Sequence, residues 1–174
     1  MRKGQTAMEH LMTYGWAILI IMVVIAVLFY LGVLNPRIPS QCIFPTGISC
    51  STYKISADTG KLTLQIGQET GKTIRMTGVS CTQNNSPDFA SDGIITYGSG
   101  NNITVTSGRT AIISDPTSST KPWLNISCTD ANGNLPSDTN IGTQYSGWIY
   151  VRYTEMDTNL TRTRTGTFTA KYEA

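Results

Sequence analysis

The residues from Trp16 to Leu34 form an apolar run that constrains the fold more than any other feature of this chain. Nearly every side chain in the run is aliphatic or aromatic, and no formally charged residue lies between His10 and Asn35. As a helix, these nineteen residues would span roughly 28 Å, close to the thickness of a bilayer's hydrocarbon core. A helix in the core of a soluble domain keeps a polar face, and this run has none. The run therefore predicts a helix that inserts into a membrane.

The residues that precede the run differ from those of an ordinary secretory signal. Such a signal has a short apolar core followed by a small-residue cleavage site, whereas this run is longer and no such site follows it. Arg2 and Lys3 come before the run, which predicts that the N-terminus stays in the cytoplasm and that the rest of the chain lies outside. Glu9 is a lone carboxylate at the start of the run. A charge there is costly unless it lies at the interface or has a partner, so Glu9 is a candidate functional residue.

The segment Lys3-Gly4-Gln5-Thr6-Ala7-Met8-Glu9 resembles the class III signal peptide of archaeal type IV pilins. In that family a membrane peptidase cuts between the glycine and the glutamine, so the apolar helix stays with the mature protein. The resemblance implies that Gly4 and Gln5 are the cleavage pair. It also implies that Glu9 becomes the fifth mature residue, the position where type IV pilins carry a glutamate. Ala7 departs from the pattern, because serine is common at that position.

The resemblance also implies a function, a location and a set of partners. It favours an adhesion-type pilin, since archaellins share the architecture but typically lack this glutamate. The precursor would lie in the cell membrane, be cut by a prepilin peptidase, and polymerise with identical or related pilin subunits into an extracellular filament, with an assembly ATPase supplying work. Glu9 would accept hydrogen bonds from a neighbour's new amine at Gln5 or from Thr6. A buried carboxylate without its partner is strongly unfavourable, which would penalise wrong registers during assembly.

The chain divides into four predicted parts. These are a cleaved leader at 1–4, a membrane and filament-core helix at 5–34, a proline-containing connector at 35–46 and an extracellular domain at 47–174. Asn35-Pro36 is expected to end the helix, because a residue before proline is driven out of the α region.

The extracellular part shows the period-two alternation of β-strands. The strand candidates are 61–66, 73–76, 94–97, 102–106, 110–114, 123–128, 147–154 and 163–172. Turn sequences rich in Gly, Asp and Asn separate them. Many short strands with no helical stretch among them predict an antiparallel β-sandwich. The expected fold class is therefore α+β, with one long helix followed by a β-sandwich.

The last strand candidate has two distinct faces. Five alternate threonines share one of them: Thr161, Thr163, Thr165, Thr167 and Thr169. On the other face, Phe168 and Tyr172 suit a core, while Arg162 and Arg164 must lie toward its rim. We interpret the threonine face as a solvated surface, with a dense O-glycan or subunit-contact face as the alternative.

The cysteines and sequons favour an extracellular location. The four cysteines are Cys42, Cys50, Cys81 and Cys128, an even number that suits an oxidising compartment. Four cysteines allow three pairings, and we prefer Cys42–Cys50, which closes a short loop, together with Cys81–Cys128, which joins the ends of two strand candidates; four buried thiols are the alternative. Four N-glycosylation sequons begin at Asn84, Asn102, Asn125 and Asn159.

Composition argues against several other classes of function. The chain has 13 Lys and Arg and 11 Asp and Glu, so loss of Arg2 and Lys3 leaves a neutral mature chain with no electrostatic case for binding nucleic acid. The single histidine, His10, lies ahead of the β domain, so Ser-His-Asp and Cys-His mechanisms lack an imidazole there. We expect no enzyme, no cofactor and no metal site. The segment 130–134 faintly resembles a calcium loop, and we interpret it as a turn.

The alternative function is that of a membrane-anchored or minor pilin-like protein whose β-sandwich binds a sugar or another surface ligand. Trp123, Tyr145 and Trp148 are the aromatic residues that could line such a site. Aromatic side chains also fill cores and subunit contacts, so the structure has to decide whether these three are exposed.

Overall fold

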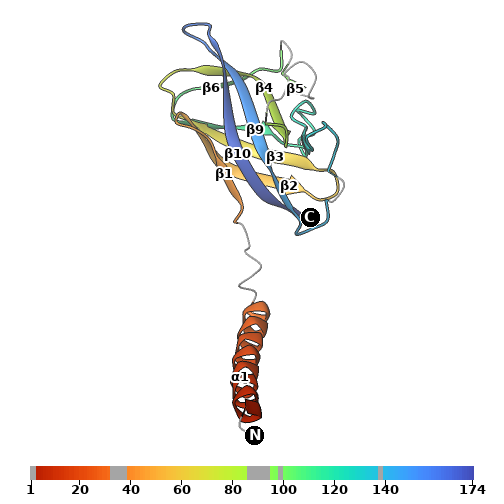
Figure 1. Cartoon of the computed structure of the whole chain (residues 1–174). Helices are drawn as coiled ribbons and strands as arrows, with labels where there is room; N and C mark the ends of the chain where they lie inside the picture. The colour runs from red at the N-terminus through yellow and green to blue at the C-terminus, as the bar shows by residue number, and fades with distance from the viewer. Residues whose placement is uncertain (1–2, 32–38, 86–94, 98–99, 137–138) are drawn as a thin grey trace. The chain divides into compact units, whose positions relative to one another are not determined.

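The computed structural model describes residues 3–31, 39–85, 95–97, 100–136 and 139–174 and divides the chain into two units, Met1–Ile38 and Pro39–Ala174 (Figure 1). The first unit contains helix α1, Lys3–Tyr30. The second contains β1 (Gln41–Ile43), β2 (Ile48–Ser56), β3 (Lys61–Gln68), β4 (Ile74–Thr82), β5 (Ile95–Thr96), β6 (Ile103–Val105), β7 (Arg109–Ser114), β8 (Ile126–Thr129), β9 (Gln144–Glu155) and β10 (Thr161–Glu173). The prediction of one apolar helix followed by a mostly β domain is confirmed.

Helix α1 carries apolar side chains around its whole circumference. From Met12 to Tyr30 none of its side chains is buried within the single chain. Trp16 is 70% exposed and Phe29 is 61% exposed. The described part of the helix runs to Tyr30, and the backbone N–H of Leu31 donates a helical hydrogen bond to the carbonyl of Val27. The remainder of the predicted helix and the first part of the predicted connector, 32–38, lie outside the described residues.

The strands of the second unit close into a barrel, so the prediction of a sandwich was wrong. Going round the barrel, the paired strands are β10, β2, β3, β8, β4 and β9, and β9 pairs again with β10. Two of these pairings are parallel and only two residue pairs long: β10 with β2, and β4 with β8. Alternation along a strand shows which side chains face the core, but it does not show which strand edges meet. Pairing both edges removes the exposed edges that a sandwich would leave.

The two disulfides lie at these two short parallel seams. At the seam between β4 and β8, Cys81 and Cys128 are direct register partners and are joined by a disulfide. At the seam between β10 and β2, β1 pairs with β10, and Cys42 of β1 is joined by a disulfide to Cys50 of β2. These two disulfides are the pairing that we preferred on the sequence. The Cys81–Cys128 disulfide reinforces one of the shortest ladders of the barrel, and Cys42–Cys50 joins β1 to the part of β2 that β10 does not pair with.

Strand β1 lies inside the segment that the sequence predicted to be a connector, so the β domain begins earlier than predicted. It pairs antiparallel with β10, and Gly166 of β10 lets the chain pass closely over it. A Cβ atom at Gly166 would lie 2.8 Å from the ring of Phe44 and 2.9 Å from the carbonyl oxygen of Ile43. The contact requires glycine, because the obstructing carbonyl belongs to the backbone and cannot rotate away.

The interior of the barrel is filled by alternate side chains of its longest strands. Leu62, Leu64 and Ile66 of β3 are fully buried, as the alternation of that strand predicted. Phe168 and Tyr172 of β10 are also buried, and aromatic contacts join Phe168 to its neighbours in the core. Polar residues replace this apolar filling at the end of the barrel where the turn between β9 and β10 lies.

Candidate functional site

The predicted processing and assembly residues lie in the first turns of α1. The helix begins at Lys3 and includes Gly4, Gln5, Thr6 and Glu9. Arg2 lies outside the described residues, and the structure does not describe the side chains of 3–7 and 9–11. Cleavage at Gly4–Gln5 and the role of Glu9 therefore stay predictions.

The exposed part of α1 is an apolar surface suited to contact with lipid or with other apolar protein surfaces. The span Met12–Tyr30 is long and apolar enough to cross a membrane. A soluble protein rarely exposes so large a continuous apolar surface, because each exposed side chain orders or displaces water unfavourably. The helix therefore indicates membrane insertion or a signal anchor, and the disulfides of the second unit agree with an extracellular location.

Three of the four predicted glycosylation sequons begin at exposed residues of the β domain. These residues are Asn102, Asn125 and Asn159. Asn159 also has a positive φ of 56° in the turn between β9 and β10, a conformation that asparagine tolerates better than most residues. Asn84 is half-buried, and the last residue of its sequon lies outside the described residues. Occupancy of all four sites stays a prediction.

An ionic cluster surrounds Glu155 near the end of β9. The side chain of Glu155 is only 8% exposed, and its carboxylate accepts hydrogen bonds from Lys72 Nζ at 2.8 Å, Arg162 Nε at 2.5 Å and Thr158 Oγ1 at 2.8 Å. Lys72 also lies 3.2 Å from the carboxylate of Asp157. These contacts lower the pKa of Glu155 to about 2, and the hydrogen bond with Lys72 has the largest effect. The pKa of Lys72 is raised, most by its hydrogen bond with Glu155 and next by that with Asp157.

Lys72 and the neighbouring carboxylates are not set up to form a covalent amide bond between their side chains. Condensation of Lys72 with Asp157 would lose water and would require a neutral amine and a protonated carboxyl group nearby as general acid. The raised pKa of Lys72 keeps the amine charged, and the lowered pKa of Glu155 keeps its carboxylate ionised. The cluster is therefore an ion-pair network that links the turn after β9 to the turn between β3 and β4.

The lowered pKa of Glu155 predicts how stability should change in acid. The carboxyl group has a pKa of about 2 in the folded state against an ordinary value of 4.5, so its contribution is complete above about pH 4.5 and is lost as the pH falls toward 2. Thermal unfolding followed by circular dichroism should show a smaller acid-induced loss for Glu155→Gln than for the wild type. Glu69→Gln, an exposed glutamate, is the matched control, and an unchanged acid profile in Glu155→Gln would contradict the assignment.

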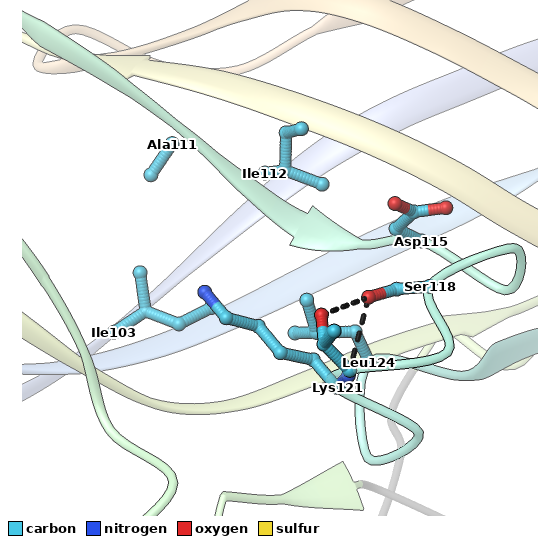
Figure 2. A pocket seen from close by; sticks show the side chains of 8 residues that line it. Ile103, Ala111, Ile112, Asp115, Ser118, Lys121 and Leu124 are labelled. Atoms are coloured by element: carbon cyan, nitrogen blue, oxygen red, sulfur yellow. Dashed lines mark hydrogen bonds between the residues drawn. The ribbon is translucent and has the colours of Figure 1, made fainter.

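A pocket of about 420 Å³ lies between β6, β7 and the loop that follows β7 (Figure 2). Its apolar side is formed by Ile103, Ile112 and Leu124. Several polar groups of the loop bond within it: Asp115 Oδ1 accepts hydrogen bonds from the backbone and hydroxyl of Thr117, and Ser118 Oγ accepts one from the backbone N–H of Lys121. These bonds stabilise the loop and leave Asp115 a weak candidate for ligand recognition.

The three aromatic candidates for a sugar site do not form one exposed surface. Tyr145 is 1% exposed and its hydroxyl donates a hydrogen bond to the carbonyl of Thr129. Trp123 is half-buried and packs edge-to-face on Tyr97, with ring centroids 5.2 Å apart. Trp148 is half-buried in β9. The structure therefore assigns Tyr145 to the core, and these aromatic residues give no support to a sugar-binding platform.

The segment that faintly resembles a calcium loop is held by hydrogen bonds of its own. Asp130 Oδ1 accepts hydrogen bonds from the backbone N–H groups of Asn132 at 2.8 Å and Asn134 at 2.9 Å. This is the bonding of an aspartate-capped turn. Over the described residues, no group of three or more His, Cys, Asp or Glu side chains gathers as metal ligands would.

The chain matches no protein family, no curated protein and no solved structure. The features of the chain that bear on its function are therefore the chemistry of the N-terminal segment and the surfaces of the two units. The apolar surface of α1 and the polar end of the barrel are the two features that folding of the single chain does not account for.

Proposed function

We propose that the protein is a pilin-like structural subunit of an archaeal type IV-like surface filament, with a role in surface attachment. The observation that carries the proposal is the fully exposed apolar surface of α1 from Met12 to Tyr30, directly after the Gly4–Gln5 motif and Glu9. A helix of this kind needs either lipid or other apolar helices around it. A filament core built from copies of the same helix provides the second environment after a bilayer has provided the first.

Assembly depends on specific contacts more than on the hydrophobic effect. Lipid is already as apolar as the side chains of α1, so transfer of the helix from bilayer to filament changes its solvation little. Close packing and the pairing of Glu9 with the amine of a neighbouring Gln5 would then determine the register. Cleavage ahead of Gln5 creates that amine, so processing and assembly are coupled through one bond. Cyclisation of Gln5 would remove the amine and leave hydrogen bonding without the ion pair.

The β barrel is the part of the subunit that such a filament would display. Both of its disulfides reinforce the barrel outside a reducing compartment. The threonine face of β10 is exposed at Thr161, Thr163, Thr165 and Thr167, while Thr169 is buried. An exposed hydroxyl-rich surface of low charge supports an extracellular role.

The processing step provides the first test of the proposal. Intact-mass analysis of the protein produced with its peptidase should give a chain that begins at Gln5, with or without cyclisation of that residue. Gly4→Val should leave the precursor uncut, because the larger side chain blocks the glycine position that the peptidase recognises in the family. Gly15→Ala, which adds a methyl group with no atom within 4 Å, is the matched control. A mature chain that begins at Met1 or after Leu34 would overturn the proposal.

A ligand-binding β domain on the same membrane anchor is the second candidate. It is favoured by the polar pocket at one end of the barrel, which is lined by Arg164, whose buried Nε has no hydrogen-bond partner among the described residues. Negative-stain microscopy of material sheared from producing cells separates the two candidates, because filaments that contain the protein support the first and their absence supports the second.

A further inference from the structure

The end of the barrel at the turn between β9 and β10 contains a polar pocket of about 430 Å³. The turns between β1 and β2 and between β3 and β4 form its other sides, and the hairpin of β9 and β10 is the blue pair of strands in Figure 1. Three cationic side chains, Lys72, Arg162 and Arg164, and two acidic ones, Glu69 and Glu155, line the pocket. The lining side chains alone have one excess positive charge, and Asp157 next to the pocket offsets it by pairing with Lys72.

The walls of this pocket are fixed by contacts between the turns. The backbone N–H of Glu69 donates a hydrogen bond of 2.9 Å to the carbonyl of Gly47. Gly47 has a φ of +100°, and a Cβ atom there would lie 3.0 Å from the methyl group of Thr70. Gln68 is fully buried below, and its Nε2 donates to Thr70 Oγ1 at 2.7 Å. Because Thr70 Oγ1 accepts this bond, its own hydroxyl hydrogen is available to another acceptor.

Arg164 differs from the other two cations of the pocket. Lys72 and Arg162 are both held by Glu155. The Nε atom of Arg164 is buried and has no hydrogen-bond partner, and no ion pair among the described residues includes Arg164. A buried N–H of a cationic group without a partner is unfavourable, and a negatively charged acceptor bound at the guanidinium of this half-buried residue would offset part of that cost.

We propose that this pocket binds a carboxylate group through the guanidinium of Arg164, with the hydroxyl of Thr70 as a second donor. The planar guanidinium presents paired N–H donors that match the two oxygens of a carboxylate. Glu69 and Glu155 already contribute two negative charges to the lining, and Asp157 pairs with Lys72 beside it, so these carboxylates repel a singly charged ligand less than a doubly charged one.

The carboxylate can come from two sources that share this chemistry. One is a small organic acid or an acidic sugar, and the other is an aspartate or glutamate side chain on a second copy of the chain. The site is independent of the proposed filament function, because its residues all belong to the β barrel. A failure of the carboxylate test would therefore leave the filament proposal untouched.

The side-chain Nε–H resonance of Arg164 reports directly on this site. The experiment uses the full-length ¹⁵N-labelled protein in detergent micelles, with the resonance assigned by its loss in Arg164→Lys. Sodium acetate and sodium D-glucuronate are added at constant ionic strength against sodium chloride. We expect a saturable shift of the Arg164 resonance with both carboxylates, while the resonance of the exposed Arg109 stays in place.

Dilution of the protein without added carboxylate distinguishes the sources. A shift that depends on protein concentration identifies a carboxylate of a second copy, and a shift only with acetate or glucuronate identifies a free ligand. Arg164→Gln should weaken carboxylate binding, followed at the backbone amides of Gly47 and Thr70, about tenfold or more, while Arg109→Gln should not. The proposal is overturned if the wild-type resonance responds neither to carboxylates nor to protein concentration, or responds equally to chloride. This measurement on the wild-type protein tests the proposal even if Arg164→Gln fails to fold.

Discussion

Replacing Glu9 with alanine is expected to prevent incorporation of the protein into filaments while the β barrel still folds. The reason is that a carboxylate at the start of an apolar helix has few possible partners, and in the proposed filament its partner would be the amine that cleavage creates at Gln5. Loss of Glu9 would then leave that amine buried without its counter-ion, which would oppose assembly more strongly than the lost attraction alone. The measurement is the fraction of the protein recovered in sheared filaments, with membrane-bound protein counted separately.

One further variant at this position and one at its neighbour identify the physical cause. Glu9→Gln keeps a hydrogen-bond acceptor but removes the charge, so partial assembly would assign the effect to hydrogen bonding and full loss to the ion pair. His10→Ala changes the neighbouring polar residue and serves as the matched control. Normal filaments formed by Glu9→Ala would show that Glu9 has no role in assembly.

Replacing both Cys81 and Cys128 with serine is expected to open the barrel between β4 and β8. Only two residue pairs join these strands, so the disulfide is a large part of what connects them. The bond closes a loop with a sequence separation of 47, for which the chain-entropy relation gives a stabilisation of about 4 kcal/mol. Urea unfolding followed by tryptophan fluorescence should show this loss, and hydrogen exchange should become faster in β8.

The second disulfide provides the control for this prediction. Cys42 and Cys50 are separated by 8 residues, for which the same relation gives about 2.5 kcal/mol. Serine at both positions should therefore destabilise the protein less and should release β1 without affecting β8. An equal loss of stability in the two double variants, or unchanged exchange in β8, would contradict the role assigned to the Cys81–Cys128 seam.

Most of the longer strands were predictable because each carries its own alternation. Strands β3, β7, β9 and β10 all lie where apolar and polar residues alternate, although β9 and β10 extend further than predicted. Strand β2 was missed because its register shifts between Cys50 and Thr52, which breaks the alternation. Strand β1 was missed because it has only three residues in a proline-containing segment, and its pairing depends on β10, far along the chain.

The ionic features of the barrel end were only partly predictable. The sequence placed Arg162 and Arg164 on the core-facing side of β10, near its rim, and could go no further. Only the folded chain shows that Lys72, from the turn after β3, and Arg162 share Glu155. The same arrangement leaves Arg164 without a partner in the described part of the molecule. Residues that look equivalent in a strand thus have different electrostatic roles.

The sequence by itself determined the apolar helix and the existence of a β domain, because composition and short-range periodicity are local properties, whereas it left three disulfide pairings possible and only favoured one of them. The tertiary structure alone decided that the domain is a closed barrel, that β1 belongs to it, and that Arg164 lines a pocket with no ion pair to any described residue. These features depend on contacts between residues far apart in the chain, such as Cys81 with Cys128 and Lys72 with Glu155. Strands pair at their edges, and buried charged side chains form ion pairs, only when distant segments of the chain come together. A local sequence pattern does not show which segments do so.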